Sequence, residues 1–365
     1  MVQDLPDNTT NKPTFLDACE AHFWEIFEKS HSKDDIDNCI LANRLKLQLI
    51  PSDMMAPLKF LDGHGGTLVG GNQLKGNMNK LVTDLLNRIG GMLVFRFENI
   101  GDLGDIIEAI SLQRKGIQLT PDGHPDRPWY LANLGTSLRQ QFSHTGELTD
   151  ISEAVSLQRT AVQLIPEGHP DMPRCLAELG TSLGHQFSCT AELKDLSDAI
   201  SFLQKAVELT PEDRPDSPAY LVDLGSALLQ HALCTRELTD ISEAILFQQK
   251  AVQLIPKGHP DRPRCLADLG ISLQYRFSHT RELTDICKSI SSLQNAVQLT
   301  PEGHQDEPRC LAELGISLQY RFSHTRELTD ICKSISSLQN AVQLTPEGHQ
   351  DRPRYLAELG TSLQY

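Results

Sequence analysis

The chain repeats part of itself almost without change. Residues 271–315 recur as residues 316–360 with two differences, Glu307 against Arg352 and Cys310 against Tyr355. Self-similarity at a fixed period indicates a repeat architecture, because each unit is one supersecondary element that buries its apolar face only by stacking on its neighbours. The sequence therefore predicts an array whose fold follows from a single unit.

One glycine column and two proline columns give the period. The glycine recurs every 45 residues, at Gly90, Gly135, Gly180, Gly225, Gly270, Gly315 and Gly360. The prolines keep the same period, from Pro128 to Pro353 in one column and from Pro121 to Pro346 in the other. Proline is tolerated in the first turn of a helix and is common just after a helix ends. Two proline columns therefore predict two helices per unit.

The residues between these prolines fit a helical hairpin. Asp126 and Pro128 are suited to start the first helix, and its apolar stripe follows at Leu131, Leu134, Leu138 and Phe142. The segment 143–149 is turn-like. Asp150 with Glu153 predicts a capping-box-like start of the second helix, which should end before Pro166.

The predicted organisation has four parts. Residues 1–12 form a disordered tail, 13–51 a divergent helix hairpin, 52–78 a glycine-rich insertion, and 79–365 a regular array ending in a half repeat. This gives seven hairpins and one last helix. No phosphate-binding glycine motif can be written through the insertion, which leaves a surface excursion or a gene-model error as its explanation.

The unit resembles the tetratricopeptide repeat (TPR). Leu179 and Gly180 match the leucine–glycine pair of that motif, Ala199 and Ala206 its small residues, and Pro211 its closing proline. The resemblance implies an all-α, right-handed α-solenoid of antiparallel helix hairpins, with the extra residues of the 45-residue unit placed in long loops. Segments such as residues 95–103 resemble the tandem TPR arrays found in proteins of mushroom-forming fungi. In those proteins, the arrays often occur together with caspase-like CHAT domains or nucleotide-switch domains.

Composition excludes several partners. The net charge of −15 argues against a nucleic-acid surface, which needs clustered Lys and Arg. No run of 18 apolar residues and no signal sequence occurs, so no membrane association is expected. Several of the nine cysteines recur in core columns, where packed helices lie too far apart for most disulfides. A reducing, cytoplasmic location is expected.

The resemblance places candidate ligand contacts on the concave face of the first helices. The tentative peptide-binding set is Trp129, Arg174, Arg264, Arg309, Arg354, His185, Gln274, Tyr275, Gln319 and Tyr320. Arginine and tyrosine side chains that recur along this face could bind an extended acidic or aromatic peptide. The alternative is that duplication copied a solvated face.

No catalytic, cofactor or metal site is expected. The histidines that precede Asp126, Asp171, Asp261, Asp306 and Asp351 by two residues occur once per unit on turns, which favours a local turn role over metal binding. No unique Cys, His and Asp set stands apart from the repeat.

The sequence thus predicts a non-catalytic scaffold that binds protein or peptide partners. The alternative is the sensor arm of a CHAT protease or nucleotide-switch receptor whose effector domain is missing. The apolar face of the last helix indicates a continuing array or, alternatively, end-to-end self-association.

Overall fold

The computed structural model describes residues 12–30, 32–49, 74–304, 306–349 and 351–365, and these contain fifteen α-helices and no strand. Their bounds are α1 Lys12–Ser30, α2 Lys33–Gln48, α4 Leu74–Ile100, α5 Leu103–Leu119, α6 Arg127–Thr145, α7 Leu148–Leu164, α8 Met172–Thr190, α9 Leu193–Leu209, α10 Ser217–Thr235, α11 Leu238–Leu254, α12 Arg262–Thr280, α13 Leu283–Leu299, α14 Glu307–Thr325, α15 Leu328–Leu344 and α16 Arg352–Leu363. The all-α array of helix hairpins is confirmed, as is the count of seven hairpins and one last helix within the described residues.

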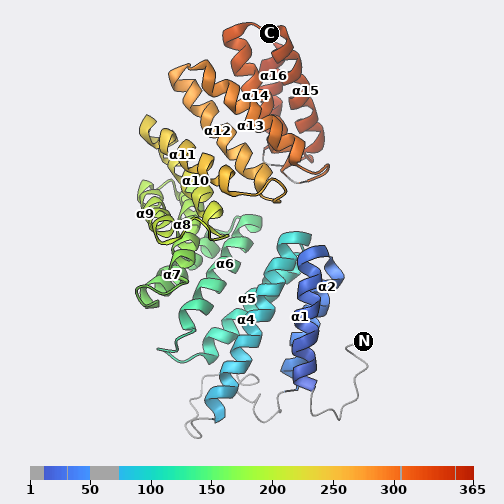
Figure 1. Ribbon diagram of the computed structural model, residues 1–365, viewed down its shortest axis with the longest axis vertical. Helices are drawn as coiled ribbons and strands as arrows, with labels where there is room; N and C mark the ends of the chain where they lie inside the picture. The colour runs from blue at the N-terminus through green and yellow to red at the C-terminus, as the bar shows by residue number, and fades with distance from the viewer. Residues whose placement is uncertain (1–11, 31, 50–73, 305, 350) are drawn as a thin grey trace. The chain divides into compact units, whose positions relative to one another are not determined.

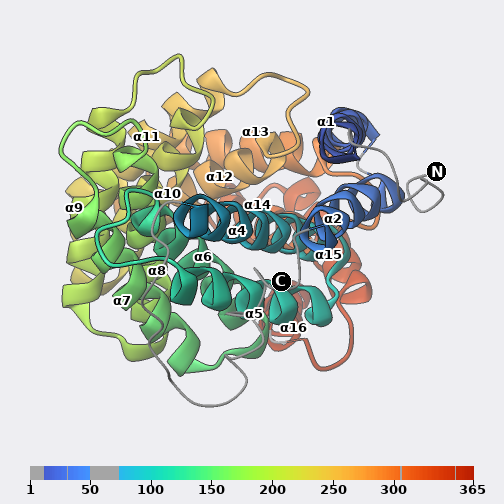
Figure 2. The ribbon, with the colours of Figure 1, turned by 90° about the horizontal axis from the view of Figure 1, so that it is seen from below.

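The chain divides into two compact units, Met1–Cys189 and Thr190–Tyr365. Within each unit, helices that follow one another in sequence pack together, as α4 does with α5 and α12 with α13 (Figure 1). In the first unit α2 lies between α1 and α4 (Figure 2). Consecutive packing of this kind is the contact pattern of a helical repeat array.

The expected long loop between the helices of a hairpin is wrong. In the second repeat α6 continues to Thr145 and α7 begins at Leu148, which leaves only Gly146 and Glu147 between them. The polar residues that look turn-like in sequence are helical, and their hydroxyls are satisfied by bonds back to the preceding turn. Ser143 donates to the carbonyl of Arg139 and Thr145 to that of Gln141. The extra residues of the unit therefore lengthen its helices.

The start of the second helix also differs from the expectation. Glu147, and not Asp150, is the N-cap of α7, and Asp150 lies inside the first turn. A carboxylate there is still favourable, because the first turn carries the positive end of the helix dipole. The backbone N–H of Glu147 is bound by the hydroxyl of Thr145, so a threonine at the preceding helix end takes over a capping role.

In the six hairpins from α4–α5 to α14–α15, the first helix ends on a residue with positive φ. Gly101 and Gly146 occupy this position in the first unit, with φ of 78° and 70°. Ala191, Arg236, Arg281 and Arg326 occupy it in the second unit, with φ between 56° and 64°. Residues with a Cβ adopt this left-handed conformation at a cost that glycine does not have.

The 45-residue glycine column marks where the two helices of a hairpin touch. A Cβ on Gly270 would lie 2.6 Å from Cγ of Leu293 on α13, and one on Gly135 would lie 3.2 Å from the backbone oxygen of Ala154 on α7. These separations confirm the predicted close approach, because real Cβ contacts below 3.0 Å do not occur without rearrangement.

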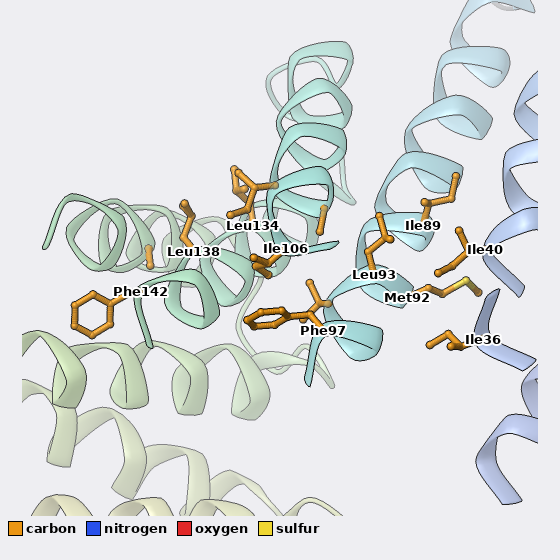
Figure 3. Packing of buried hydrophobic residues seen from close by; sticks show 14 of the residues in the cluster. Ile36, Ile40, Ile89, Met92, Leu93, Phe97, Ile106, Leu134, Leu138 and Phe142 are labelled. Carbon is orange, nitrogen blue, oxygen red and sulfur yellow. The ribbon is translucent and has the colours of Figure 1, made fainter. Parts of the chain in front are cut away.

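A hydrophobic core runs through the helices of the first unit. Figure 3 shows Ile36 and Ile40 of α2 facing Met92 of α4, with Phe97 next to Ile106 of α5. Farther along the same cluster lie Leu134, Leu138 and Phe142 of α6. The apolar stripe predicted from the sequence is therefore the buried face.

Consecutive hairpins also share a buried polar seam. Ser137 of α6 donates to the side-chain oxygen of Gln113 of α5 at 2.7 Å. In the last repeats hydroxyls replace the glutamine: Ser289 lies 3.0 Å from Ser317, and Ser334 lies 3.0 Å from Ser362. At the equivalent positions Gln158 and Ser182, and Gln248 and Ser272, are buried but make no side-chain hydrogen bond.

The seam has one repeat without polar groups. Ala227 interrupts the serine column, and the preceding helix α9 offers it only Ala199 and Leu203. Ala227 is thus the one position between Ser137 and Ser362 in this column that follows a hairpin without a polar side chain in the seam.

A second polar contact links the two helices of a hairpin. Arg276 of α12 makes a bidentate pair with Asp285 of α13, with both N–O distances at 2.7 Å, and Arg321 does the same with Asp330. The aspartates are 2% exposed. In the second repeat Gln141 replaces the arginine opposite Asp150, and burial raises the pKa of Asp150.

Parts of the predicted organisation lie outside the described residues. These are residues 1–11 of the tail and residues 50–73, which include most of the insertion. Residues 74–78, assigned to the insertion, belong to α4. On α16, Leu356 and Leu363 are 48% and 59% exposed, and a Cβ on Gly360 would have no atom within 4 Å. Tyr365, just after this helix, is 59% exposed.

Candidate functional site

The first unit contains a cleft of about 1010 Å³ on the face of its first helices. Side chains of α1, α4 and α6 form most of its lining, and Arg174 of α8 also contributes to it. This volume is at the upper end of the roughly 300–1,000 Å³ typical of ligand clefts. A site of this size can hold a peptide segment of several residues.

Both tryptophans of the chain line this cleft. Trp24 comes from α1 and packs edge-on against Phe95, with ring centroids 6.1 Å apart. Trp129 comes from α6, and the guanidinium of Arg174 lies 4.2 Å above its ring. Tryptophan and arginine dominate the binding energy of many protein interfaces, because both offer a large contact area with a polar handle.

The acidic residues of the cleft are held by their neighbours. Lys80 pairs with Asp126 at 3.2 Å, and this hydrogen bond raises the pKa of Lys80. Lys46 and Arg88 both pair with Glu20. These contacts leave the charges of Asp126 and Glu20 largely compensated within the protein.

The hydroxyl of Tyr130 donates to Asp84 in the same cleft. Burial, together with this hydrogen bond, raises the pKa of Tyr130. Tyr130 therefore stays protonated, and its hydroxyl is committed to Asp84.

The arginine column of the first helices behaves differently in the second unit. Arg309 reaches back to Asp268 of the preceding first helix at 2.6 Å. Arg354 reaches back to Glu313 at 2.6 Å. Burial opposes the charge of both arginines, yet the facing carboxylates raise the pKa of each. These side chains act as ties between repeats.

Arg264 also pairs with an acid of the preceding first helix, Asp223, at the longer distance of 3.8 Å. The equivalent of these acids opposite Arg174 is Asn133, whose side-chain oxygen lies 3.5 Å from the guanidinium. No ion pair links Arg174 to a carboxylate within the described part of the chain. Arg174 is thus the one arginine of the column that faces an amide.

The other predicted contacts are spread through the structure. Gln274 and Gln319 are 6% and 7% exposed, and Gln274 accepts a hydrogen bond from Ser317, so both lie inside the stack. Tyr275 is half-buried and Tyr320 is 37% exposed, which leaves Tyr320 accessible to a partner. His185 is half-buried with its ring edge-on to Phe142, at a centroid distance of 6.1 Å.

Among the cleft residues that the sequence reasoning omitted are Trp24, Asn133 and Gly91. A signal for each was present. Trp24 aligns with a first-helix position of the divergent hairpin, and Asn133 follows Arg88 in a column whose later members are all acidic: Glu178, Asp223, Asp268, Glu313 and Glu358. Gly91 is an exposed helical residue of the lining, and a Cβ added to it would have no atom within 4 Å.

The histidines at the repeat junctions have the predicted turn role. Nδ1 of His124 accepts the backbone N–H of Asp126 at 3.1 Å, and His169, His259, His304 and His349 make the same bond at 3.2 Å. Within the described residues no cluster of His, Cys, Asp and Glu could hold a metal ion.

The buried cysteines are poor nucleophiles. Burial raises the pKa of Cys39, Cys175 and Cys310 to about 11 and that of Cys265 to about 12. A thiol with such a pKa is almost entirely protonated at neutral pH, whereas the thiolate is the reactive form. Among the described helices none is long and apolar enough to cross a membrane.

No protein-family model matches the chain, and no curated protein matches it. Several solved structures are similar. BtubC (BKLC) from P. vanneervenii is 14% identical with a TM-score of 0.48, over 67% of this chain and 95% of that one. TTC0263, a thermophilic TPR protein from Thermus thermophilus, is 16% identical with a TM-score of 0.43, over 64% and 98%. The hypoxic regulator of sterol synthesis Nro1, a nuclear import adaptor, is 14% identical with a TM-score of 0.42, over 76% and 93%. The likeness is one of fold.

Proposed function

We propose that this protein is a non-catalytic interaction scaffold that binds a protein partner through the first-helix face of its first unit. The observation that carries the proposal is the cleft of about 1010 Å³, in which both tryptophans of the chain lie. Aromatic side chains that are partly exposed in a concave site provide binding energy at low cost in conformational entropy.

Gly91 offers a way to close the cleft without removing a contact. It lies in the lining of the cleft, on α4, and a side chain there would point into open space. Gly91→Gln fills part of the cleft, and Gly91→Ala is the matched control. Both substitutions favour the helix, because glycine is a weak helix former.

The test is a quantitative capture experiment from an extract of the source organism, with wild type and both variants immobilised. The proposal expects specific proteins on wild type and Gly91→Ala and their loss on Gly91→Gln. Equal capture by all three would place the interaction elsewhere. Capture by none above an unrelated helical protein would overturn the scaffold function itself.

We further propose a reducing, cytoplasmic setting. All nine cysteines are free, including the buried column-mates Cys175, Cys265 and Cys310. Mass spectrometry of protein alkylated in the cell would reveal an oxidised pair if the proposal is wrong. Self-association of the molecule stays a prediction that light scattering tests. No contact among the described residues favours the alternative of a sensor arm.

A further inference from the structure

Arg174 differs from its column-mates in having its charge uncompensated. Arg309 and Arg354 each face a carboxylate at 2.6 Å. Arg174 faces the neutral amide of Asn133 at 3.5 Å and rests on the ring of Trp129. A guanidinium stacked on an aromatic ring is positioned but keeps its edge N–H donors, since stacking uses its face.

The surroundings of Arg174 do not supply the missing anion. Asp126 and Glu20 in the cleft are paired with lysine and arginine, and Asp84 accepts from Tyr130. Asp126 and Glu20, which are bound to cations, repel an incoming anion less than free carboxylates, because their charge is largely neutralised. Asp84 has no cation bound to it among the described residues, but it interacts electrostatically with Lys80. The cleft thus presents a single unpaired cation beside two tryptophans.

We propose that the cleft binds an acidic peptide segment of the partner, with one of its carboxylates on Arg174 and a neighbouring apolar side chain between Trp129 and Trp24. This inference rests on the proposed function and specifies its ligand. Arg174 provides the bidentate donors that match a carboxylate, in the place that Asp268 takes for Arg309. The ligand therefore completes a contact that other repeats make internally.

The two tryptophans make the test direct. Because the chain has no tryptophan outside the cleft, its intrinsic fluorescence reports occupancy of this site. The probes are three pools of decapeptides that lack tryptophan. The pools differ only in a fixed central pair, which is Glu-Leu, Gln-Leu or Lys-Leu, and the other positions carry the same random mixture of residues. Each pool is titrated into the full chain while the emission spectrum is followed.

The decisive variant is Asn133→Asp, which restores the acid found in the other repeats and leaves Arg174 in place. Wild type is expected to bind the Glu-Leu pool about tenfold more tightly than the Gln-Leu pool, the size of one charge-assisted contact. Asn133→Asp should remove that preference, as should Arg174→Gln. Circular dichroism checks that both variants remain folded.

Asp268→Asn is the matched control, since it alters the same contact in a repeat outside the cleft. It should leave the fluorescence titration unchanged. The inference is overturned if Asn133→Asp binds the Glu-Leu pool as tightly as wild type, or if the Lys-Leu pool binds best. In either case partners lost on Gly91→Gln would still uphold the scaffold function, so the two proposals fail separately.

Discussion

The two units of the molecule contain the same arginine column and use it differently. In the second unit Arg309 and Arg354 are fixed to carboxylates of the preceding repeat. In the first unit Arg174 faces Asn133 and a tryptophan. One amide in place of a carboxylate separates an arginine that ties repeats together from one that is available to a partner. In a repeat array, function is to be sought where a column changes.

The polar contact inside each hairpin varies from repeat to repeat. Arg276 binds Asp285 in the second unit and Arg96 makes the same bidentate pair with Asp105 in the first, whereas Gln141 stands opposite Asp150. The hairpins are thus cross-linked to different degrees. Substitutions at equivalent positions should therefore change the stability by different amounts, and in one case in opposite directions.

The largest effect is expected from Gly270→Val. Its Cβ would meet Leu293 at 2.6 Å, so the helices of the hairpin must separate. Overpacking of this kind costs about 1–3 kcal/mol. Thermal unfolding measures the loss. Gly91→Ala, a substitution of an open glycine, should raise the stability by roughly 0.5–1 kcal/mol. An unchanged melting temperature for Gly270→Val would place that glycine away from the helix contact.

Asp285→Asn should follow in size. The neutral amide cannot accept both N–H groups of Arg276, and charge-assisted hydrogen bonds contribute about 1.5–3 kcal/mol. Urea unfolding provides the measurement, and Asp330→Asn is a replicate in the twin repeat. If neither variant loses stability, the bidentate pairs contribute nothing to folding in solution, and a hairpin with an arginine is no more stable than the one with Gln141.

The polar seam predicts that two opposite substitutions, serine to alanine in one repeat and alanine to serine in another, both lower the stability. Ser137→Ala leaves the buried oxygen of Gln113 without its donor, and Ala227→Ser places a hydroxyl where Ala199 and Leu203 offer no acceptor side chain. Each should cost about 1–2 kcal/mol. Serine and alanine differ little in size, so a stabilising Ala227→Ser would show that the column does not depend on its partner.

Asp150→Asn should give the smallest effect, and a gain. The folded state holds the proton of Asp150 more tightly than the unfolded chain, because burial raises its pKa. Its contribution to stability is therefore greatest below the unfolded pKa of about 3.9 and falls as the pH rises through the folded pKa. The amide removes this loss, so the variant should be more stable than wild type at pH 7, by less than about 1 kcal/mol after solvent screening.

Denaturant midpoints at pH 7 and pH 3 test the sign. The difference between Asp150→Asn and wild type should shrink at pH 3, where the aspartate is protonated in both states. A loss of stability at pH 7 would mean that Gln141 compensates the ionised carboxylate as well as an arginine does.

Much of the fold could be predicted from the sequence because helix periodicity and proline placement are local signals. The apolar stripe from Leu131 to Phe142 and the glycine contacts follow from spacing alone. The loop lengths did not follow, since Ser143 and Thr145 read as turn residues until their bonds to the preceding turn are known.

The site was predictable only in part. Trp129 and Arg174 were found as members of a column, but the pairing of Arg309 with Asp268 joins residues 41 apart in different repeats. Sequence spacing within a unit does not reveal such a contact. Without knowledge of this contact between repeats, nothing in the sequence distinguishes Asn133, and Arg174 looks equivalent to Arg264, Arg309 and Arg354.

The serine seam has a consequence for how such arrays can be recombined. Each buried polar pair is shared between the second helix of one hairpin and the first helix of the next, as in Ser289 with Ser317. A transplanted hairpin would therefore leave a mismatched neighbour on both sides, whereas a segment cut between the two helices of a hairpin would take its pairs with it. The unit that keeps its seam pairs is offset by one helix from the unit that the sequence displays, although such a cut separates contacts within the hairpin, such as Arg276 with Asp285.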